Sequence, residues 1–501
     1  MLSSPEALLF SLRPELALGL WLVILGLVYL ISIPIYNVWF HPLSKYPGPR
    51  LWAATQIPLV RMVFSGTSHK KMLEMHKTYG DVVRIAPNQL AYSDGAAWND
   101  IMGHRKRGQG ENGKDPIFFK TLANSVIAAD REKHTRMRRT LAHGFSAQSM
   151  MEQQPLIQGY VDVLVQKLRE NCADGNKPVE MTSWYNYATF DIIGDLAFGE
   201  PFGCLENSNY HPWVSLIFDR IRLSAVSTAI RRLPFGDNLI PLLLSKEERK
   251  RFQAHYQLTQ EKVNKRLALS SPRPDFIQVM TEREGDQKFT LPELWDNASL
   301  LIIAGSETTA TTLSGITYYL LTHPEALEKV KSEVRTSFTS EAEIDLLSVQ
   351  KLGYMLAVLQ ETLRMYPPVA GAIPRKVQPG GDVICGGYVP ENALVGIWQW
   401  PTNHLAKNFT LPDSFIPERW LGDARFSSDP KDVVQPFSYG PRNCIGKNLA
   451  YAEMRLILAK IMWNFDLALH PDSTDWMERN LSFSLWQKPN LHVYIKPRVT
   501  A

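Results

Sequence analysis

The segment that says most about the architecture reads Phe437-Ser438-Tyr439-Gly440-Pro441-Arg442-Asn443-Cys444-Ile445-Gly446. It places one cysteine in a glycine-punctuated loop just before a predicted helix. The positive end of that helix favours a thiolate at Cys444, and N–H groups of the loop can hydrogen-bond the sulfur, as suits a ligand to iron. We expect positive φ angles at Gly440 and Gly446, which would let the backbone approach a flat ligand closely. The alternative is a buried structural cysteine in a turn.

The rest of the chain predicts one large, mainly helical domain. It has 501 residues, of which 45% are apolar and 21% charged, and no linker or repeat divides it. The formal net charge of +4 argues against a nucleic-acid protein, and the four cysteines lack the paired spacing of disulfides or a zinc site. A strand hairpin is predicted at 81–85 and 89–93. The predicted helices are 129–146, 156–171, 184–198, 246–269, 291–322, 352–366 and 444–465.

Three further motifs support one family resemblance. They are Glu361-Thr362-Leu363-Arg364, Pro417-Glu418-Arg419-Trp420 and Ala304-Gly305-Ser306-Glu307-Thr308-Thr309. With the cysteine loop, they resemble the motifs of the cytochrome P-450 superfamily, the haem-thiolate monooxygenases. The resemblance implies the triangular P-450 fold, mainly α with small β-sheets, and the cofactor haem b (iron protoporphyrin IX). It also implies that Cys444 is the axial iron ligand, with cofactor contacts from Phe437, Gly440, Arg442 and Gly446.

The first two motifs are expected to brace the haem-binding core. Glu361 and Arg364 are three residues apart and share one helix face, so they can act as one ionic unit. The resemblance adds Arg419 as the third member of the network. Such networks give geometry more than stability. The alternative is an ordinary surface salt bridge.

The third motif lies inside the long apolar helix and resembles the oxygen-activating segment of the family. The Thr308 hydroxyl can bond the carbonyl of Ala304 and open the helix locally. Gly305 would permit that distortion and remove side-chain bulk over the ring. A carboxylate in such a helix needs a task or a partner, so Glu307 is expected to relay protons with Thr308. The alternatives are a plain back-bonded threonine and a structural ion pair at Glu307.

Haem carries two propionates, and arginine suits carboxylates. His134 and Arg138 resemble the pair that meets one propionate, although many members of the family have tryptophan at the first position. Arg375 resembles the arginine that binds the other propionate, and Arg442 can pair with a propionate as well. The alternative for the first pair is a solvated basic face.

The N-terminus predicts a membrane anchor. The run Leu16–Ile35 spans roughly 30 Å as a helix, the thickness of a bilayer's hydrocarbon core. A cleaved signal peptide, the main rival, has a shorter apolar core and a small-residue cleavage site. Lys45 and Arg50 follow the run, which favours a cytosolic body on the endoplasmic reticulum membrane with a single span. The predicted parts are a lumenal segment 1–15, the anchor 16–36, a proline-rich hinge 37–50 and the haem-binding monooxygenase domain 51–501.

The resemblance implies a monooxygenase that hydroxylates or otherwise oxidises a hydrophobic small molecule with O2. Electrons are expected from NADPH through a separate NADPH-cytochrome P-450 reductase, because no flavin or dinucleotide domain is visible; cytochrome b5 is a further candidate partner. Lys133, Arg136 and Arg139 could dock an acidic reductase, with plain surface charge as the alternative. The expected walls of the substrate pocket are 117–127, 297–301, 369–373 and 483–485.

The segment 184–205 looks like hydroxylases of filamentous-fungal secondary metabolism, which tailor terpenoid, polyketide or alkaloid skeletons. A sterol or xenobiotic hydroxylase is the alternative within the enzyme class. A haem-thiolate isomerase or peroxygenase would not need the acid–threonine pair. A non-enzymatic haem sensor would carry a partner or DNA-binding module, and none is visible.

Overall fold

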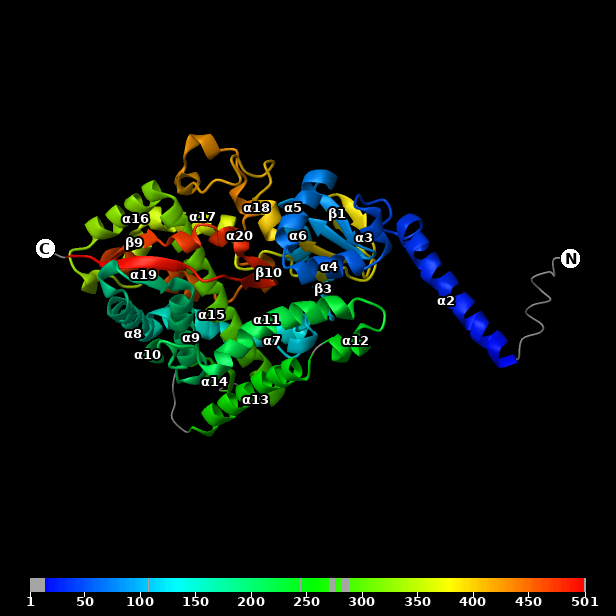
Figure 1. Ribbon diagram of the computed structural model, residues 1–501, viewed down its shortest axis with the longest axis horizontal. Coiled ribbons are helices and arrows are strands. Elements are labelled where there is room, and N and C mark those ends of the chain that lie inside the picture. Colours follow the sequence, from blue (N-terminus) through cyan, green and yellow to red (C-terminus); the bar gives the residue numbers. More distant parts are fainter. Residues whose placement is uncertain (1–13, 107, 244, 270–274, 282–287, 500–501) are drawn as a thin grey trace.

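The computed structural model describes residues 14–499, except 107, 244, 270–274 and 282–287. Helices make up most of the body, and small sheets lie among them (Figure 1). The helices are α2 (Pro14–Trp39), α3 (Arg50–Ala54), α4 (Ile57–Ser65), α5 (Ser68–Tyr79), α6 (Ala96–Met102), α7 (Arg131–Leu141), α8 (Ala147–Asn171), α9 (Met181–Phe198), α10 (Cys204–Asn207), α11 (Pro212–Arg231), α12 (Gly236–Leu243), α13 (Lys246–Ala268), α14 (Phe276–Thr281), α15 (Leu291–Thr322), α16 (Pro324–Ser337), α17 (Gly353–Met365), α18 (Gln399–Asn403), α19 (Lys447–Asn464) and α20 (Trp476–Arg479).

The strands form four small sheets in the described part of the chain. The largest has the order β1-β2-β8-β5-β3, in which only the β2–β8 pair is parallel. Its strands are β1 (Val82–Ala86), β2 (Gln89–Tyr92), β3 (Gly113–Lys114), β5 (Arg375–Lys376) and β8 (Leu394–Ile397). A second sheet has the order β4-β12-β9, from β4 (Pro178–Glu180), β9 (Phe465–Leu469) and β12 (His492–Pro497). The hairpins are β6 (Asp382–Ile384) with β7 (Gly387–Val389), and β10 (Leu481–Phe483) with β11 (Leu485–Gln487).

Helix α15 is the central element of the body. It starts with a capping box between Thr290 and Glu293 and ends at His323, just before a proline that cannot continue it. It packs along α9 and also contacts α13, α17 and α19. A Cβ on Gly305 would lie 2.7 Å from Cδ1 of Ile193 in α9, so glycine is required for this close approach. The predicted bounds of this helix, 291–322, are confirmed.

Helix α2 projects alone from the body (Figure 1). Its segment Leu18–Trp39 has a mean hydropathy of 2.4 and is not buried, so it is long and apolar enough to cross a membrane. Pro34 lies inside the helix and does not end it. The following segment packs on the largest sheet and on the β6–β7 hairpin: the N–H of Arg84 in β1 donates to the carbonyl of Pro47 at 2.7 Å, and the Tyr46 hydroxyl donates to the carbonyl of Tyr388 in β7 at 2.8 Å.

Most predicted elements are present with shifted ends. The predicted hairpin is β1 and β2, and the last long helix starts at Lys447, three residues after Cys444. Helix α8 begins at Ala147 and runs through Pro155, whereas the sequence placed its start after that proline. The Ser146 hydroxyl, which accepts a hydrogen bond from the Ser149 N–H, caps the earlier start.

Candidate active site

A cavity of about 270 Å³ lies between α15 and the loop that carries Cys444. The cysteine and the loop residues Phe437, Arg442 and Gly446 line one side. The α15 residues Ala304, Gly305, Thr308, Thr309 and Thr312 line another. Apolar side chains contribute much of the remaining wall: Val126, Ile127, Phe145, Leu300, Leu301, Leu363, Val369, Ile373 and Leu449. The structure therefore brings the cysteine loop and the threonine segment to one enclosed space.

The cysteine loop is fixed by its own backbone. The Cys444 N–H donates to the carbonyl of Phe437 at 2.8 Å. Gly440 has φ +73°, and a Cβ there would lie 2.0 Å from the carbonyl oxygen of Met102, so glycine is required. Gly446 forms the N-cap of α19 with a φ of −84°, so it does not use the positive φ that glycine allows. Enclosure by the protein raises the pKa of the Cys444 thiol, while the Gly446 N–H and the charges of Arg138 and Lys447 oppose that rise.

Arg138 reaches the loop rather than standing free. Its guanidinium donates to the backbone carbonyl of Asn443 and to Asn443 Oδ1, the latter at 2.5 Å. It still lines the cavity. The residue before the cysteine is therefore tied to α7, and Arg138 positions the loop as well as facing the cavity.

Basic groups crowd one part of the cavity wall. Arg375 is 3% exposed, its Nε has no hydrogen-bond partner among the described residues, and burial together with the nearby Arg442 lowers its pKa to about 10. Lys114, which sequence reasoning missed, lines the same wall, and burial, Arg375 and Arg442 hold its pKa well below the usual range. Mutual repulsion of this kind is relieved by an anionic ligand. The donor set fits a group with two carboxylates and a metal that accepts a cysteine sulfur, as haem has.

Two residues predicted to contact propionates have surroundings that the sequence did not indicate. Arg442 has a half-buried carboxylate neighbour, Glu111, at 2.5 Å and donates to the carbonyl of Ala129 at 2.7 Å. His134 is buried in the wall, and burial lowers its pKa to about 4, with Arg442 and Arg138 adding to the shift. The imidazole is therefore neutral at neutral pH, so it can offer a hydrogen bond and not a charge.

The predicted ionic core is present and fully buried. Arg364 donates to Glu361 through Nε at 2.9 Å and Nη2 at 2.7 Å. Arg419 Nε lies 3.6 Å from Glu361 Oε1, and the Trp420 indole N–H donates to Glu361 Oε2 at 2.9 Å. The main partner of Arg419 is Asp429, an ion pair that the sequence did not indicate. This core ties α17 to the segment that follows α18, because Arg364 also donates to the carbonyls of Pro412 and Ser414.

The residues of the α15 motif, 304–309, do not all face the same cavity. The Thr308 hydroxyl donates to the carbonyl of Ala304 at 2.6 Å, as expected, and both residues line the cavity. α15 runs as one helix through this segment, so any local opening there does not interrupt the helix. Gly305 lines the cavity, but the absence of a side chain at this position makes room for Ile193 of α9, as described above.

Glu307 points away from this cavity. It is 1% exposed and forms an ion pair with Lys488, whose ammonium also donates to Thr311 Oγ1 at 2.8 Å. Burial raises the pKa of Glu307, and Lys488 opposes that rise. Glu307 lines a second cavity of about 580 Å³, together with Phe483 and Leu485. The structure therefore does not bring Glu307 to the space that Thr308 faces, and the predicted wall 483–485 belongs to the second cavity.

Another acidic group near the site was missed. Glu453 of α19 is 1% exposed, and burial raises its pKa well above the usual value.

The three basic residues of α7 that were predicted to dock a reductase are not alike in exposure. Lys133 and Arg139 are exposed, whereas Arg136 pairs with Glu293 at 2.5 Å and contributes little to an open surface.

Comparison with known proteins gives one consistent result. The family model described as Cytochrome P450 matches residues 45–494. The chain is 48% identical over 492 residues to Trichothecene C-15 hydroxylase of Fusarium sporotrichioides, covering 98% of this chain and 99% of that protein. It is 44% identical over 491 residues to Cytochrome P450 monooxygenase astJ of Aspergillus oryzae, covering 97% and 96%. It is 44% identical over 479 residues to Averantin hydroxylase of Dothistroma septosporum, covering 94% and 90%.

Proposed function

Because this chain belongs to the cytochrome P450 family and is a monooxygenase, we propose that it hydroxylates a hydrophobic small molecule in fungal secondary metabolism. The single observation that carries the proposal is that Cys444 and Thr308 line one and the same cavity. Similarity to proteins named trichothecene and averantin hydroxylases supports a tailoring step on a terpenoid, polyketide or alkaloid skeleton.

Cys444 is proposed as the axial ligand of haem b. A haem bound through a cysteine sulfur supplies O2 activation and the insertion of one oxygen atom into a C–H bond. Arg375, Arg442 and Lys114 would neutralise the two propionates, and His134 would donate a hydrogen bond to one of them. Phe437 and Gly446 line the cavity and would shape the surface against the ring, whereas Gly440, which does not line it, would act by letting the loop pass close to Met102.

The remaining wall would bind and orient the substrate. Val126, Ile127, Leu301, Val369 and Ile373 are apolar, so they favour an apolar substrate face and exclude water from the reaction space. Thr308 holds a hydroxyl at the helix surface that faces this space, where it can pass a proton. In the proposed relay Glu307 supplies that proton from behind the helix, which requires its pair with Lys488 to open.

Electrons are proposed to come from NADPH through NADPH-cytochrome P-450 reductase, with cytochrome b5 as a second candidate donor. The exposed Lys133 and Arg139 of α7 offer positive charge for an acidic partner. Helix α2 is proposed to anchor the chain in the endoplasmic reticulum membrane, with residues 51–501 on the cytosolic side.

The test is Cys444→Ala in the full-length protein, with Cys385→Ala as the matched control because Cys385 lies outside the cavity. We expect the control to keep the thiolate-type carbon monoxide spectrum of the reduced protein and Cys444→Ala to lose it. An unchanged spectrum in Cys444→Ala would refute the assignment. To find the substrate, the protein is co-expressed with a reductase, and candidate skeletons are screened by the shift that each induces in the haem spectrum.

A further inference from the structure

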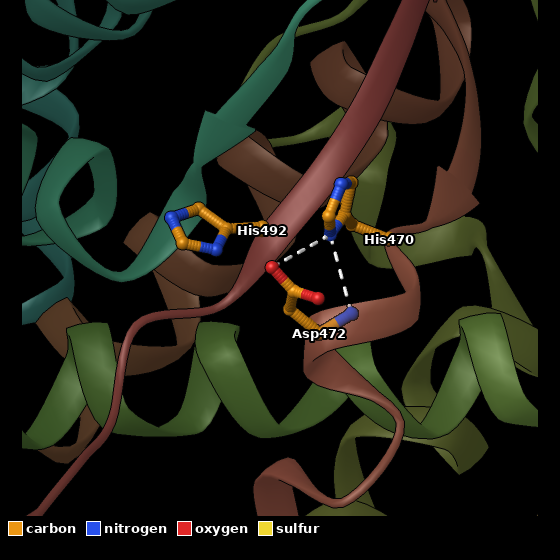
Figure 2. A group of neighbouring side chains, drawn as sticks. All are labelled: His470, Asp472 and His492. Atoms are coloured by element: carbon orange, nitrogen blue, oxygen red, sulfur yellow. Dashed lines mark hydrogen bonds and ion pairs between the residues drawn. The ribbon is translucent and has the colours of Figure 1, made fainter.

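A group of metal-ligating side chains lies on the β4-β12-β9 sheet, apart from the active site. It consists of His470, Asp472 and His492, and none of the three lines either cavity described above (Figure 2). Their ligand atoms all lie within 4.8 Å of one another. His470 and His492 are half-buried, and the Asp472 side chain is 76% exposed, so the group is open to solvent.

The backbone holds the two histidines opposite each other. β9 and β12 are antiparallel, with Leu469 paired to Val493, and the next pair in the same register is His470 with His492. The His470 N–H donates to the His492 carbonyl at 3.1 Å. The His492 N–H donates to the buried Ser473 Oγ at 2.8 Å. Side chains of directly opposed residues leave the sheet on one face, with Cβ atoms roughly 4.5–5.5 Å apart.

A proline turn brings the carboxylate to the same place. Pro471 begins the 3-10 turn η11 (Pro471–Ser473), and the Asp472 N–H donates to His470 Nδ1 at 3.2 Å. Asp472 Oδ2 lies 3.7 Å from that nitrogen. Figure 2 shows both contacts, with His492 beside them on the neighbouring strand.

We propose that His470, Asp472 and His492 bind a divalent transition-metal ion of the zinc class, with water in the remaining position. Two imidazoles and one carboxylate form a donor set that zinc accepts, at about 2.0–2.2 Å from each ligand. Magnesium and calcium prefer all-oxygen sites, so they are poor competitors. The ligand atoms must move closer together by a small rotation, which the exposed Asp472 side chain permits, and the Asp472 N–H contact to His470 is exchanged for the metal bond.

A bound ion would cross-link three pieces of the C-terminal region, the last of which follows the other two after α20, β10 and β11. It would join the end of β9, the turn η11 and the start of β12. β12 in turn pairs with β4, where His492 faces Glu180, and β4 leads directly into α9. Because the ion binds this folded arrangement and not the unfolded chain, it should raise the unfolding temperature.

The experiment uses the untagged, full-length, haem-loaded protein after treatment with a chelator. Zn²⁺ is titrated against a competing zinc-responsive dye, and the unfolding temperature is recorded with and without the ion. We expect one ion per chain, a higher unfolding temperature with zinc, and no displacement by excess Mg²⁺. His492→Phe, which keeps an aromatic ring against His470, and Asp472→Asn should each weaken zinc binding by about tenfold or more.

His104→Ala is the control, because His104 is an exposed histidine elsewhere on the surface, and it should bind zinc as the wild type does. The carbon monoxide spectrum of each variant verifies that it is folded. Wild-type affinity in both His492→Phe and Asp472→Asn would overturn the proposal, as would failure of the wild type to bind zinc. Loss of binding in His104→Ala would overturn it too, since the ion would then lie elsewhere.

Discussion

The buried pair Glu307–Lys488 gives a stability prediction that can be worked from the structure. The two side chains are 2% and 3% exposed, and the pair joins α15 to the residue after β11. Removing one partner of a buried ion pair leaves the other charge unpaired and costs about 3–5 kcal/mol. We therefore expect Lys488→Met to lower the free energy of unfolding at neutral pH by about that amount.

Replacing both partners should behave differently from replacing one. A buried pair exchanged for apolar side chains of similar volume is often neutral or stabilising. Glu307→Leu combined with Lys488→Met should therefore recover most of the stability that the single variant loses. The deficit of Lys488→Met should also shrink on acidification. Without the lysine, nothing opposes the rise that burial causes in the pKa of Glu307. The folded variant then binds a proton at a pH where the unfolded chain has released it, so lowering the pH stabilises the folded state.

The assay is denaturant unfolding of the haem-loaded protein, followed by haem absorbance and by tryptophan fluorescence. Lys71→Met is the control, because Lys71 and Glu74 form an exposed pair with side chains 49% and 65% exposed, and such pairs contribute about 0–1 kcal/mol. If the double variant is no more stable than Lys488→Met, the two side chains are not energetically coupled and the reasoning is refuted.

Three further predictions follow from the site and the anchor. Thr308→Val should bind haem and substrate as before but form less product, by about 10²–10⁴-fold at most, and release hydrogen peroxide instead. Product formation fully coupled to NADPH consumption in this variant would exclude the relay. Glu307→Gln should mainly slow turnover. Deleting residues 1–36 should release the protein from microsomes with its carbon monoxide spectrum intact, whereas haem loss would show that the segment packs into the core. Burial raises the pKa of Glu453 above the ordinary glutamate value of 4.5, so the free energy of unfolding of the wild type should fall as the pH rises above 4.5. Glu453→Gln should flatten this pH dependence, and the same pH dependence in the variant and the wild type would contradict the prediction.

Local patterns predicted the parts of the site that a short segment determines. The bounds of α15 follow from a long apolar run and the proline that comes just after its end, which are features of one short stretch of sequence. The contact between Glu361 and Arg364 follows from a three-residue spacing, which any helix brings onto one face. The same holds for the Thr308 hydroxyl, which bonds the carbonyl four residues earlier.

Partners from distant segments could not be predicted in this way. Lys488 reaches Glu307, and Glu111 reaches Arg442, only because loops of the tertiary structure place them there. The helical phase of α15 puts residues 307 and 308 on different faces, but it does not say which face the cavity occupies. The side-chain bond of Thr308 to the Ala304 carbonyl does not interrupt α15, which runs as one helix through this segment.

Contacts within the protein hold the cysteine loop in position: Gly440 packs against Met102, and Arg138 donates to Asn443. Charge is not balanced in the same way, because burial and Arg442 lower the pKa of both Arg375 and Lys114, Arg375 lowers that of Lys114 further, and Arg375 keeps an unpaired Nε within the described residues. A dianionic cofactor bound here would remove a repulsion that the protein otherwise carries. We therefore expect part of the stabilisation that haem gives this fold to weaken when Arg375 is replaced by an uncharged residue.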